Sequence, residues 1–209
     1  MSNMHRSRTT RRPQARAATT KAKILDAAQS LFGELGFENT QLDEVAARAG
    51  CSRGGIYAHY ASKEDLFLAL MEHRVSATFK AACQRIKEEP DLKERRNIFR
   101  HWLVQQICAP ESGTLTLEFK LYAIRRPEIR EKWLDLYNAL FAGADGLSIE
   151  LLFGENMTKA AQIEMEQRLA VLGGALSSLI LERQFRPALL APGDLQQFAE
   201  EIFDALLPL

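Results

Sequence analysis

Residues 40–63 read TQLDEVAARAGCSRGGIYAHYASK, and this stretch decides the fold of the chain. Thr40, followed three residues later by Asp43, has the pattern of a capped helix start, and Gly50 is a typical helix end. Ser52 then predicts the cap of a second short helix. Two short helices joined by a turn that contains glycine are typical of the helix-turn-helix, whose second helix enters the major groove of DNA.

The rest of the chain has the pattern of amphipathic helices. Thr20 indicates a cap, apolar residues at spacings of three and four follow it to Leu35, and Gly36 predicts the end of that helix. Ser62 predicts the cap of a long helix that runs to the residue before Pro90. No strand-like alternation persists, so we expect an all-α protein, with a three-helix helix-turn-helix head followed by a larger helical domain. The further helices are expected at about 92–108, 114–125, 128–152, 156–184 and 194–206.

Charge is divided unevenly along the chain. The formal net charge is zero, but residues 1–63 carry ten Lys or Arg and five Asp or Glu, whereas the other 146 residues carry 17 and 22. A head of charge +5 on a body of charge −5 is suited to bind a polyanion at one end. Residues 1–18 are rich in Arg, Thr and Ser and predict a disordered basic arm, either a solvated tail or an arm that reaches DNA. The expected domains are therefore 1–18, 19–65 and 66–209.

Several classes of protein are disfavoured. The three cysteines are an odd number without CxxC spacing, which predicts reduced thiols and neither a disulfide framework nor a zinc site. No apolar run reaches the roughly 18–20 residues of a membrane span, and no secretory signal is present, so we expect a cytoplasmic protein. No cofactor or metal is expected. An enzyme on a helical bundle remains a rival hypothesis, although no Ser-His-Asp order, HExxH, P-loop or paired carboxylates support it.

The second short helix carries the residues expected to contact DNA. Arg53 is expected to read guanine through N7 and O6, or else to bind a phosphate. Gly54 and Gly55 each cost about 1 kcal/mol of helix propensity relative to Ala, which close approach to DNA would explain better than a merely flexible turn. The other contacts are expected to reach phosphates, although His59 alone would more often be a packed or capping residue. The full expected set is Thr40, Ser52, Arg53, Gly54, Gly55, Tyr57, His59 and Lys63.

The stretch from about residue 21 to residue 70 resembles the DNA-binding head of the tetracycline-repressor (TetR-type) transcriptional regulators of bacteria. The resemblance rests on ILDAA…LF…G, the Thr40 cap, the AGCSRG turn, IYAHY and SKEDL. Cys51, Gly55 and Ala58 depart from the residues usual in that family. The resemblance implies a homodimer whose heads sit in successive major grooves of a palindromic operator. It also implies a C-terminal helical domain that binds a small-molecule inducer and dimerises.

The resemblance places the dimer contacts on the last two helices. The helix around residues 168–181 is rich in small residues that allow another helix to approach closely, and the last helix has an apolar stripe. The alternative is that both faces pack inside one protomer. The expected interface residues are Gly173, Gly174, Ser177, Leu181, Phe198 and Ile202.

The middle helices mix aromatic and polar side chains, as a ligand pocket does, although aromatics at helical spacing are more often plain core. Glu118 is expected either to lie buried and receive a cationic ligand or to pair with a nearby Lys or Arg. The expected pocket residues are Phe99, Trp102, Gln106, Glu118, Phe119, Tyr122, Trp133 and Tyr137.

Together these patterns predict a ligand-responsive homodimeric DNA-binding regulator. We expect a repressor that an inducer releases from its operator. The alternative is an architectural DNA-binding protein, which would bind random and operator DNA alike.

Overall fold

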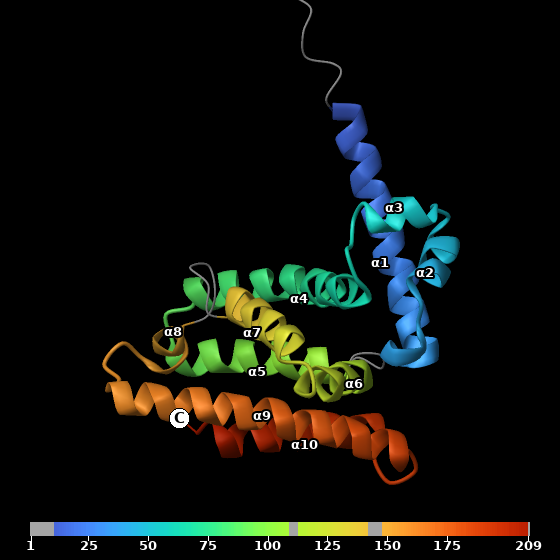
Figure 1. Cartoon of the computed structure of the whole chain (residues 1–209). Coiled ribbons are helices and arrows are strands. Elements are labelled where there is room, and N and C mark those ends of the chain that lie inside the picture. The colour runs from blue at the N-terminus through green and yellow to red at the C-terminus, as the bar shows by residue number, and fades with distance from the viewer. Residues whose placement is uncertain (1–10, 109–112, 142–147, 209) are drawn as a thin grey trace, which may run out of the picture. The chain divides into compact units, whose positions relative to one another are not determined.

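The computed structural model describes residues 11–108, 113–141 and 148–208, and within these ranges it holds ten α-helices and no strand (Figure 1). The all-α prediction is confirmed. The chain divides into two compact units, Met1–Met71 and Glu72–Leu209, which we call the head and the body. The boundary lies inside one long helix, α4 (Lys63–Glu88). No helix in the described ranges is long and apolar enough to span a membrane.

Helix α1 (Arg11–Asn39) supplies the main apolar face of the head, and Gly36 bends it near its end. Gly36 has φ 78° and ψ 169°, which glycine adopts readily and other residues avoid. The bend turns Phe37 into the core, where its ring centroid lies 5.6 Å from that of Phe32 and 5.2 Å from that of Phe67. The glycine predicted as a helix end is therefore a kink that places an aromatic residue in the core.

The beginning of α1 differs from the sequence-based expectation. Residues 1–10 of the expected arm lie outside the described residues, but the helix already begins at Arg11, so the last part of that arm is helical. Thr20 lies inside α1 and does not cap it. Ala15, Ala17 and Ala18 are the best helix formers, which explains how the helix extends past the expected cap.

The caps predicted for the next helices are confirmed. Gly50 ends α2 (Leu42–Ala49) in the left-handed conformation, with φ 68°. The Oγ of Ser52 accepts the N–H of Gly55 at 3.1 Å and caps α3 (Arg53–Tyr57). The Oγ of Ser62 accepts the N–H of Asp65 at 3.1 Å in the first turn of α4. These side chains satisfy backbone donors that a helix leaves without partners at its start.

Thr40 does not cap α2, contrary to the prediction. Its side chain is 0% exposed, and its hydroxyl lies 2.8 Å from the carbonyl oxygen of Gly36 and 3.2 Å from that of Leu31. Gln41 precedes α2 instead, and its N–H donates to the carboxylate of Glu44 at 3.2 Å. Thr40 therefore closes the end of α1.

The body consists of the rest of α4 and six further helices. Its single expected helix over 128–152 is wrong, because Ser148 starts a separate short helix by accepting the N–H of Leu151 at 3.0 Å. The other expected boundaries lie within a few residues of the observed ones. The six helices are α5 (Leu92–Cys108), α6 (Gly113–Ile124), α7 (Pro127–Phe141), α8 (Ile149–Phe153), α9 (Lys159–Phe185) and α10 (Pro192–Leu206).

The last two helices, α9 and α10, run side by side, and α10 also packs against α5 (Figure 1). Aromatic rings fill the space between α4, α5 and α10: Trp102 lies 4.9 Å from Phe79 and 6.0 Å from Phe99, and Phe99 lies 5.9 Å from Phe203, between ring centroids. The core of the body therefore lies on the inner face of α10.

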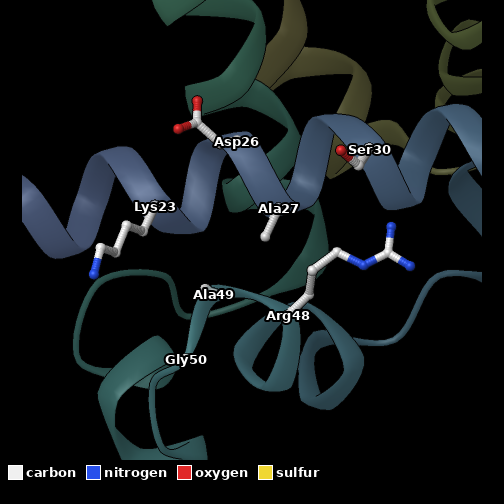
Figure 2. A pocket seen from close by; sticks show the side chains of 7 residues that line it. All are labelled: Lys23, Asp26, Ala27, Ser30, Arg48, Ala49 and Gly50. Atoms are coloured by element: carbon white, nitrogen blue, oxygen red, sulfur yellow. The ribbon is translucent and has the colours of Figure 1, made fainter.

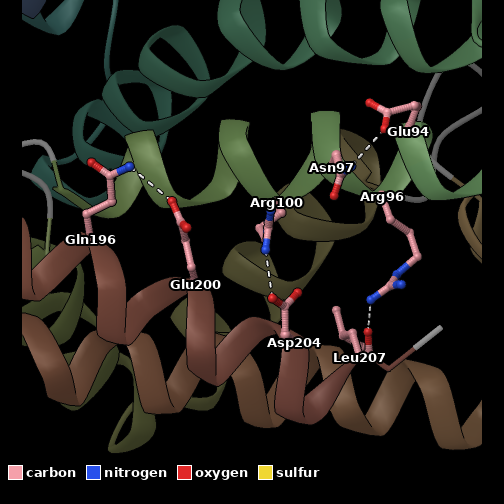
Figure 3. Close-up of polar contacts among 8 residues, drawn as sticks. All are labelled: Glu94, Arg96, Asn97, Arg100, Gln196, Glu200, Asp204 and Leu207. Carbon is pink, nitrogen blue, oxygen red and sulfur yellow. Dashed lines mark hydrogen bonds and ion pairs between the residues drawn. The ribbon is translucent and has the colours of Figure 1, made fainter.

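Polar contacts join α5 to the end of α10 (Figure 3). Arg100 and Asp204 form an ion pair at 2.7 Å. Arg96 is buried, donates to the carbonyl of Leu207, and has an aromatic ring close to its guanidinium in Phe203. Burial lowers the pKa of Arg96, which remains a cation. On α9, Arg168 donates to the Leu206 carbonyl at 3.1 Å. Two arginines thus bind the last carbonyls of α10.

Candidate nucleic-acid interface

Arg53 is the charged residue of α3, at its first position. Its side chain is 72% exposed, and its guanidinium makes a 3.2 Å ion pair with Asp43 of α2. The guanidinium carbon also lies 5.7 Å from the ring centroid of Tyr57, which is itself 45% exposed. An exposed ion pair of this kind contributes about 0–1 kcal/mol to stability. Asp43 therefore positions Arg53, but Arg53 can exchange this partner for another at little cost. Its planar set of donors remains suited to a base edge or a phosphate.

The two glycines of α3 have different surroundings. A Cβ built on Gly54 would meet nothing within 4 Å, so its surface is open to an approaching molecule. A Cβ on Gly55 would lie 3.3 Å from the Oγ of Ser52, the atom that accepts the N–H of Gly55. The geometry therefore supports close approach of another molecule at Gly54. At Gly55 the missing side chain leaves room for the Oγ of Ser52, which caps the helix.

Lys63 connects the first turn of α4 to the end of α1. Its ammonium donates to the carbonyl of Glu38 at 2.8 Å and lies 4.7 Å from the ring centroid of Phe37. Burial lowers the pKa of Lys63, against the opposing effect of nearby Glu64 and Glu38. An ammonium carries three donors, so this contact does not by itself prevent a phosphate contact.

The remaining expected contacts are not equally accessible. Tyr57 and His59 are exposed on the same short segment, and Ser52 is exposed while it caps α3. Thr40 is the exception, because its buried hydroxyl already serves the end of α1. The expected hydroxyl contact from Thr40 to a phosphate is therefore contradicted.

A groove of about 460 Å³ lies between α1 and α2, away from the residues expected to bind DNA or a ligand (Figure 2). Lys23 and Asp26 bring opposite charges to it, and the guanidinium of Arg48 is paired with Glu34 at 2.5 Å, which lowers the pKa of that carboxyl. A groove of mixed charge has no marked preference for phosphate. Its lining comprises Lys23, Asp26, Ala27, Ser30, Arg48, Ala49 and Gly50.

Asp43 is the functional candidate that the sequence analysis missed. The sequence pattern around Asp43 indicates only a helix start, whereas in the structure its carboxylate pairs with Arg53, the residue expected to read bases. The two residues are ten positions apart on different helices, so no helical spacing links them. Only the packing of α2 against α3 brings them together.

The expected pocket residues fall into two separate groups. Phe99 and Trp102 belong to the core between α5 and α10, where they are 6% and 8% exposed. Phe119 is fully buried on α6, and its ring lies 5.3 Å from Trp133 and 6.2 Å from Tyr122. The first group is plain core, which is the alternative stated above, and the second is an aromatic cluster between α6 and α7.

The polar members of the expected pocket also differ from expectation. Glu118 is exposed, so it is not a buried anchor for a cation. Tyr122 lies under the guanidinium of Arg126, 3.6 Å from its ring centroid. Burial raises the pKa of Tyr137, and 45% of that residue is exposed. Gln106 is half-buried.

The outer face of α9 and α10 is apolar and partly exposed. On α9, Val171, Leu181 and Phe185 are 58%, 38% and 79% exposed, and on α10 Phe198 is 42% exposed. A Cβ on Gly173 or Gly174 would meet nothing within 4 Å, so no contact within the protomer requires glycine there. The hydroxyls of Ser177 and Ser178 donate to the carbonyls four residues earlier, at 2.7 and 3.1 Å. The expected residue Ile202 is half-buried beside this face.

The two cysteines whose side chains are described differ in burial. Cys51 is partly exposed next to the cap of α3, and Cys83 is buried in the body, where burial raises its pKa. In the described parts of the chain, no group of three or more His, Cys, Asp or Glu side chains is placed to hold a metal ion.

Comparison with known proteins agrees with this head. Residues 24–70 match the family described as bacterial regulatory proteins, tetR family. The A-factor receptor protein of Streptomyces griseus is 41% identical over 63 residues, which cover 30% of this chain and 23% of that protein. The transcriptional repressor BepR of Brucella suis is 43% identical over 61 residues, covering 29% of each. The chain thus matches about a quarter of the length of these curated relatives.

A solved structure extends the likeness to the whole fold. The regulator FadR of Bacillus subtilis, in complex with stearoyl-CoA, superposes with a TM-score of 0.65 over 90% of this chain and 96% of that one, at 19% identity. The chain thus consists of a helix-turn-helix head, on which α3 is exposed, and a helical body. Residues 24–70 are thus similar to a tetR-family head, and the chain shares the fold of FadR.

Proposed function

We propose that this protein is a ligand-responsive homodimeric repressor that binds a palindromic operator in the bacterial cytoplasm and is released by a small-molecule inducer. The observation that carries the proposal is the exposed surface of α3. There Arg53 is held by an ion pair that is easily exchanged, beside the open backbone of Gly54. BepR, which shares the head, is itself a repressor.

The proposed contacts divide into two kinds. Arg53 reads a base edge in the major groove, where a good bidentate contact discriminates by about 1–3 kcal/mol. Ser52, Tyr57, His59 and Lys63 bind phosphates and fix the register of α3, while the surface of Gly54 lies closest to the DNA. Gly55 and Thr40 support the fold of the head.

The proposed dimer forms through the outer face of α9 and α10. Its apolar side chains are exposed in the protomer, and its glycines have no steric role there. Isologous pairing would bring each of these helices onto its copy and bury both. A Phe198→Glu change should therefore give a monomer by sedimentation velocity. Leu121→Glu, at a residue that is 64% exposed on α6, is the matched control and should leave the dimer intact.

The proposed ligand acts through the spacing of the two heads. Recognition of two half-sites requires heads about 34–36 Å apart, or a multiple of that distance. A ligand shifts the protein away from this spacing only as far as it binds the two states with different affinity. FadR, which shares the fold, was solved with stearoyl-CoA, which supports a small-molecule ligand for this protein.

The test is selection of genomic DNA fragments by the purified protein at about 150 mM salt, near physiological ionic strength. A palindrome shared by the retained fragments is expected, and Arg53→Ala should lose the preference for it. Arg186→Ala, at an exposed arginine of the body, is the control and should bind as the wild type does. Retention of fragments without a shared site, weakened equally for all sequences by Arg53→Ala, would favour the architectural alternative.

A further inference from the structure

The ion pair between Asp43 and Arg53 joins the first turn of α2 to the first residue of α3. Its side chains are 53% and 72% exposed, and an exposed pair adds little to stability, so the fold of the head does not require it. The helix dipole of α2 favours a negative charge in its first turn, but Glu44 supplies one there as well and accepts the N–H of Gln41. The fold therefore leaves the carboxylate of Asp43 available for a functional role.

The guanidinium of Arg53 has two contacts that restrict its orientation. Its Nη1 lies 3.2 Å from Oδ2 of Asp43, and its central carbon lies 5.7 Å from the ring centroid of Tyr57, one turn further along α3. The ion pair uses Nη1, whereas the edge formed by Nε and Nη2 is not part of it. That edge can give two parallel donors to N7 and O6 of guanine.

A carboxylate beside Arg53 affects the two kinds of DNA partner differently. Guanine N7 and O6 are neutral acceptors, so a guanidinium paired with Asp43 can still donate to them. A phosphate is an anion, which Asp43 repels, and the charge of Arg53 is already balanced by its partner. The pair therefore disfavours phosphate contacts, which every sequence offers, more than base contacts, which carry the sequence information.

We propose that Asp43 is a positioning residue that determines sequence specificity, because it keeps the guanidinium of Arg53 off the phosphates and leaves its Nε–Nη2 edge for guanine. The proposal rests on the proposed function, in which Arg53 reads a base. It adds the residue that prevents Arg53 from binding DNA of any sequence. Without the carboxylate, Arg53 is one more free cation, and each head gains a phosphate contact.

The experiment tests the full-length protein on two DNA probes. The first is a labelled duplex of arbitrary sequence, titrated at several salt concentrations, and the second is a pool of randomised duplexes from which the bound DNA is sequenced. Asp43→Asn should bind the arbitrary duplex about threefold to tenfold more tightly at low salt. The plot of log K against log salt should steepen by about 0.9 for each head that gains a phosphate contact. Enrichment of the preferred sequence should fall about threefold or more, because the base already occupies Arg53 there and the affinity gains less.

Three further variants separate a local effect of Asp43 from an effect of net charge. Glu44→Gln is the matched control, because it removes a charge from the same turn of α2 while the glutamine can still accept the N–H of Gln41. It should leave the enrichment and the salt slope as in the wild type, and Asp43→Glu should also retain the slope. In an Arg53→Ala background, Asp43→Asn should no longer change the slope, because its effect passes through Arg53. Equal effects of Glu44→Gln and Asp43→Asn would overturn the proposal.

Failure of this proposal and failure of the proposed function give different results. If the wild type enriches a sequence and Asp43→Asn enriches it equally well, or leaves the salt slope unchanged, the role of Asp43 is refuted and the proposed function stands. If the wild type binds the arbitrary duplex without enriching any sequence, or binds neither probe, the proposed function fails, and the specificity assigned to Asp43 fails with it.

Discussion

Replacement of Thr40 by Val should destabilise the head more than any conservative change on its surface. Valine keeps the shape of the side chain but removes the hydroxyl, which lies 2.8 Å from the Gly36 carbonyl and 3.2 Å from the Leu31 carbonyl. A net hydrogen bond contributes about 1 kcal/mol, and a buried acceptor left without a donor raises the cost. We expect the free energy of unfolding to fall by about 1–2 kcal/mol. In a domain of 60–100 residues, each kcal/mol lowers the midpoint of thermal unfolding by about 4–8 °C.

The assay uses the distribution of chromophores. The two tryptophans of the chain, Trp102 and Trp133, both lie in the body, so their fluorescence follows that unit, whereas far-ultraviolet circular dichroism follows the helices of both. The lower unfolding midpoint of the head in Thr40→Val should appear in the dichroism signal. Thr19→Val, at an exposed threonine of α1, is the control and should stay within about 0.5 kcal/mol. If Thr40→Val also changed the free energy of unfolding by less than about 0.5 kcal/mol, the hydrogen bonds of the Thr40 hydroxyl would not be what stabilises the end of α1.

Three further results are expected. Gly36→Ala should cost about 1–3 kcal/mol in the same assay, because alanine is strained at φ 78°; an unchanged midpoint would show that the bend is not required. Asp43→Asn should change stability by less than about 1 kcal/mol but strengthen DNA binding at low salt, since it frees Arg53 and removes a negative charge; equal affinities in a low-salt titration would exclude competition. Iodoacetamide at pH 8 should alkylate Cys51 well before Cys83, because burial and a raised pKa keep the latter a thiol; equal labelling in a peptide map would contradict this.

Local patterns predicted the head well because its boundaries are set by local chemistry. Ser52 and Ser62 each accept an N–H three residues ahead, and the left-handed turn at Gly50 needs no distant contact. Thr40 shows where this fails. The pattern of a cap is the same whether the hydroxyl turns forward to α2 or back to α1, and only the packed head decides between them.

The body was less predictable because its helices are apolar on more than one side. On α6, leucines, Phe119, a lysine and a glutamate follow one another with little periodicity, so residue spacing does not predict that Glu118 is exposed and Lys120 half-buried. The aromatics of α5 have the same composition as a pocket, but their partners, among them Phe203, are about a hundred residues away. Such contacts are set by the fold and not by spacing.

The two arginines at the end of α10 make the last turn of this helix necessary to the fold of the body. The ends of a domain are usually where truncation is best tolerated. Here a stop codon at Leu206 would remove the carbonyls of Leu206 and Leu207 and leave the buried guanidinium of Arg96 without the acceptor to which it donates. Truncation before Leu206 should therefore act as a loss of function, with the shortened protein removed by proteolysis although the helices before α10 are intact.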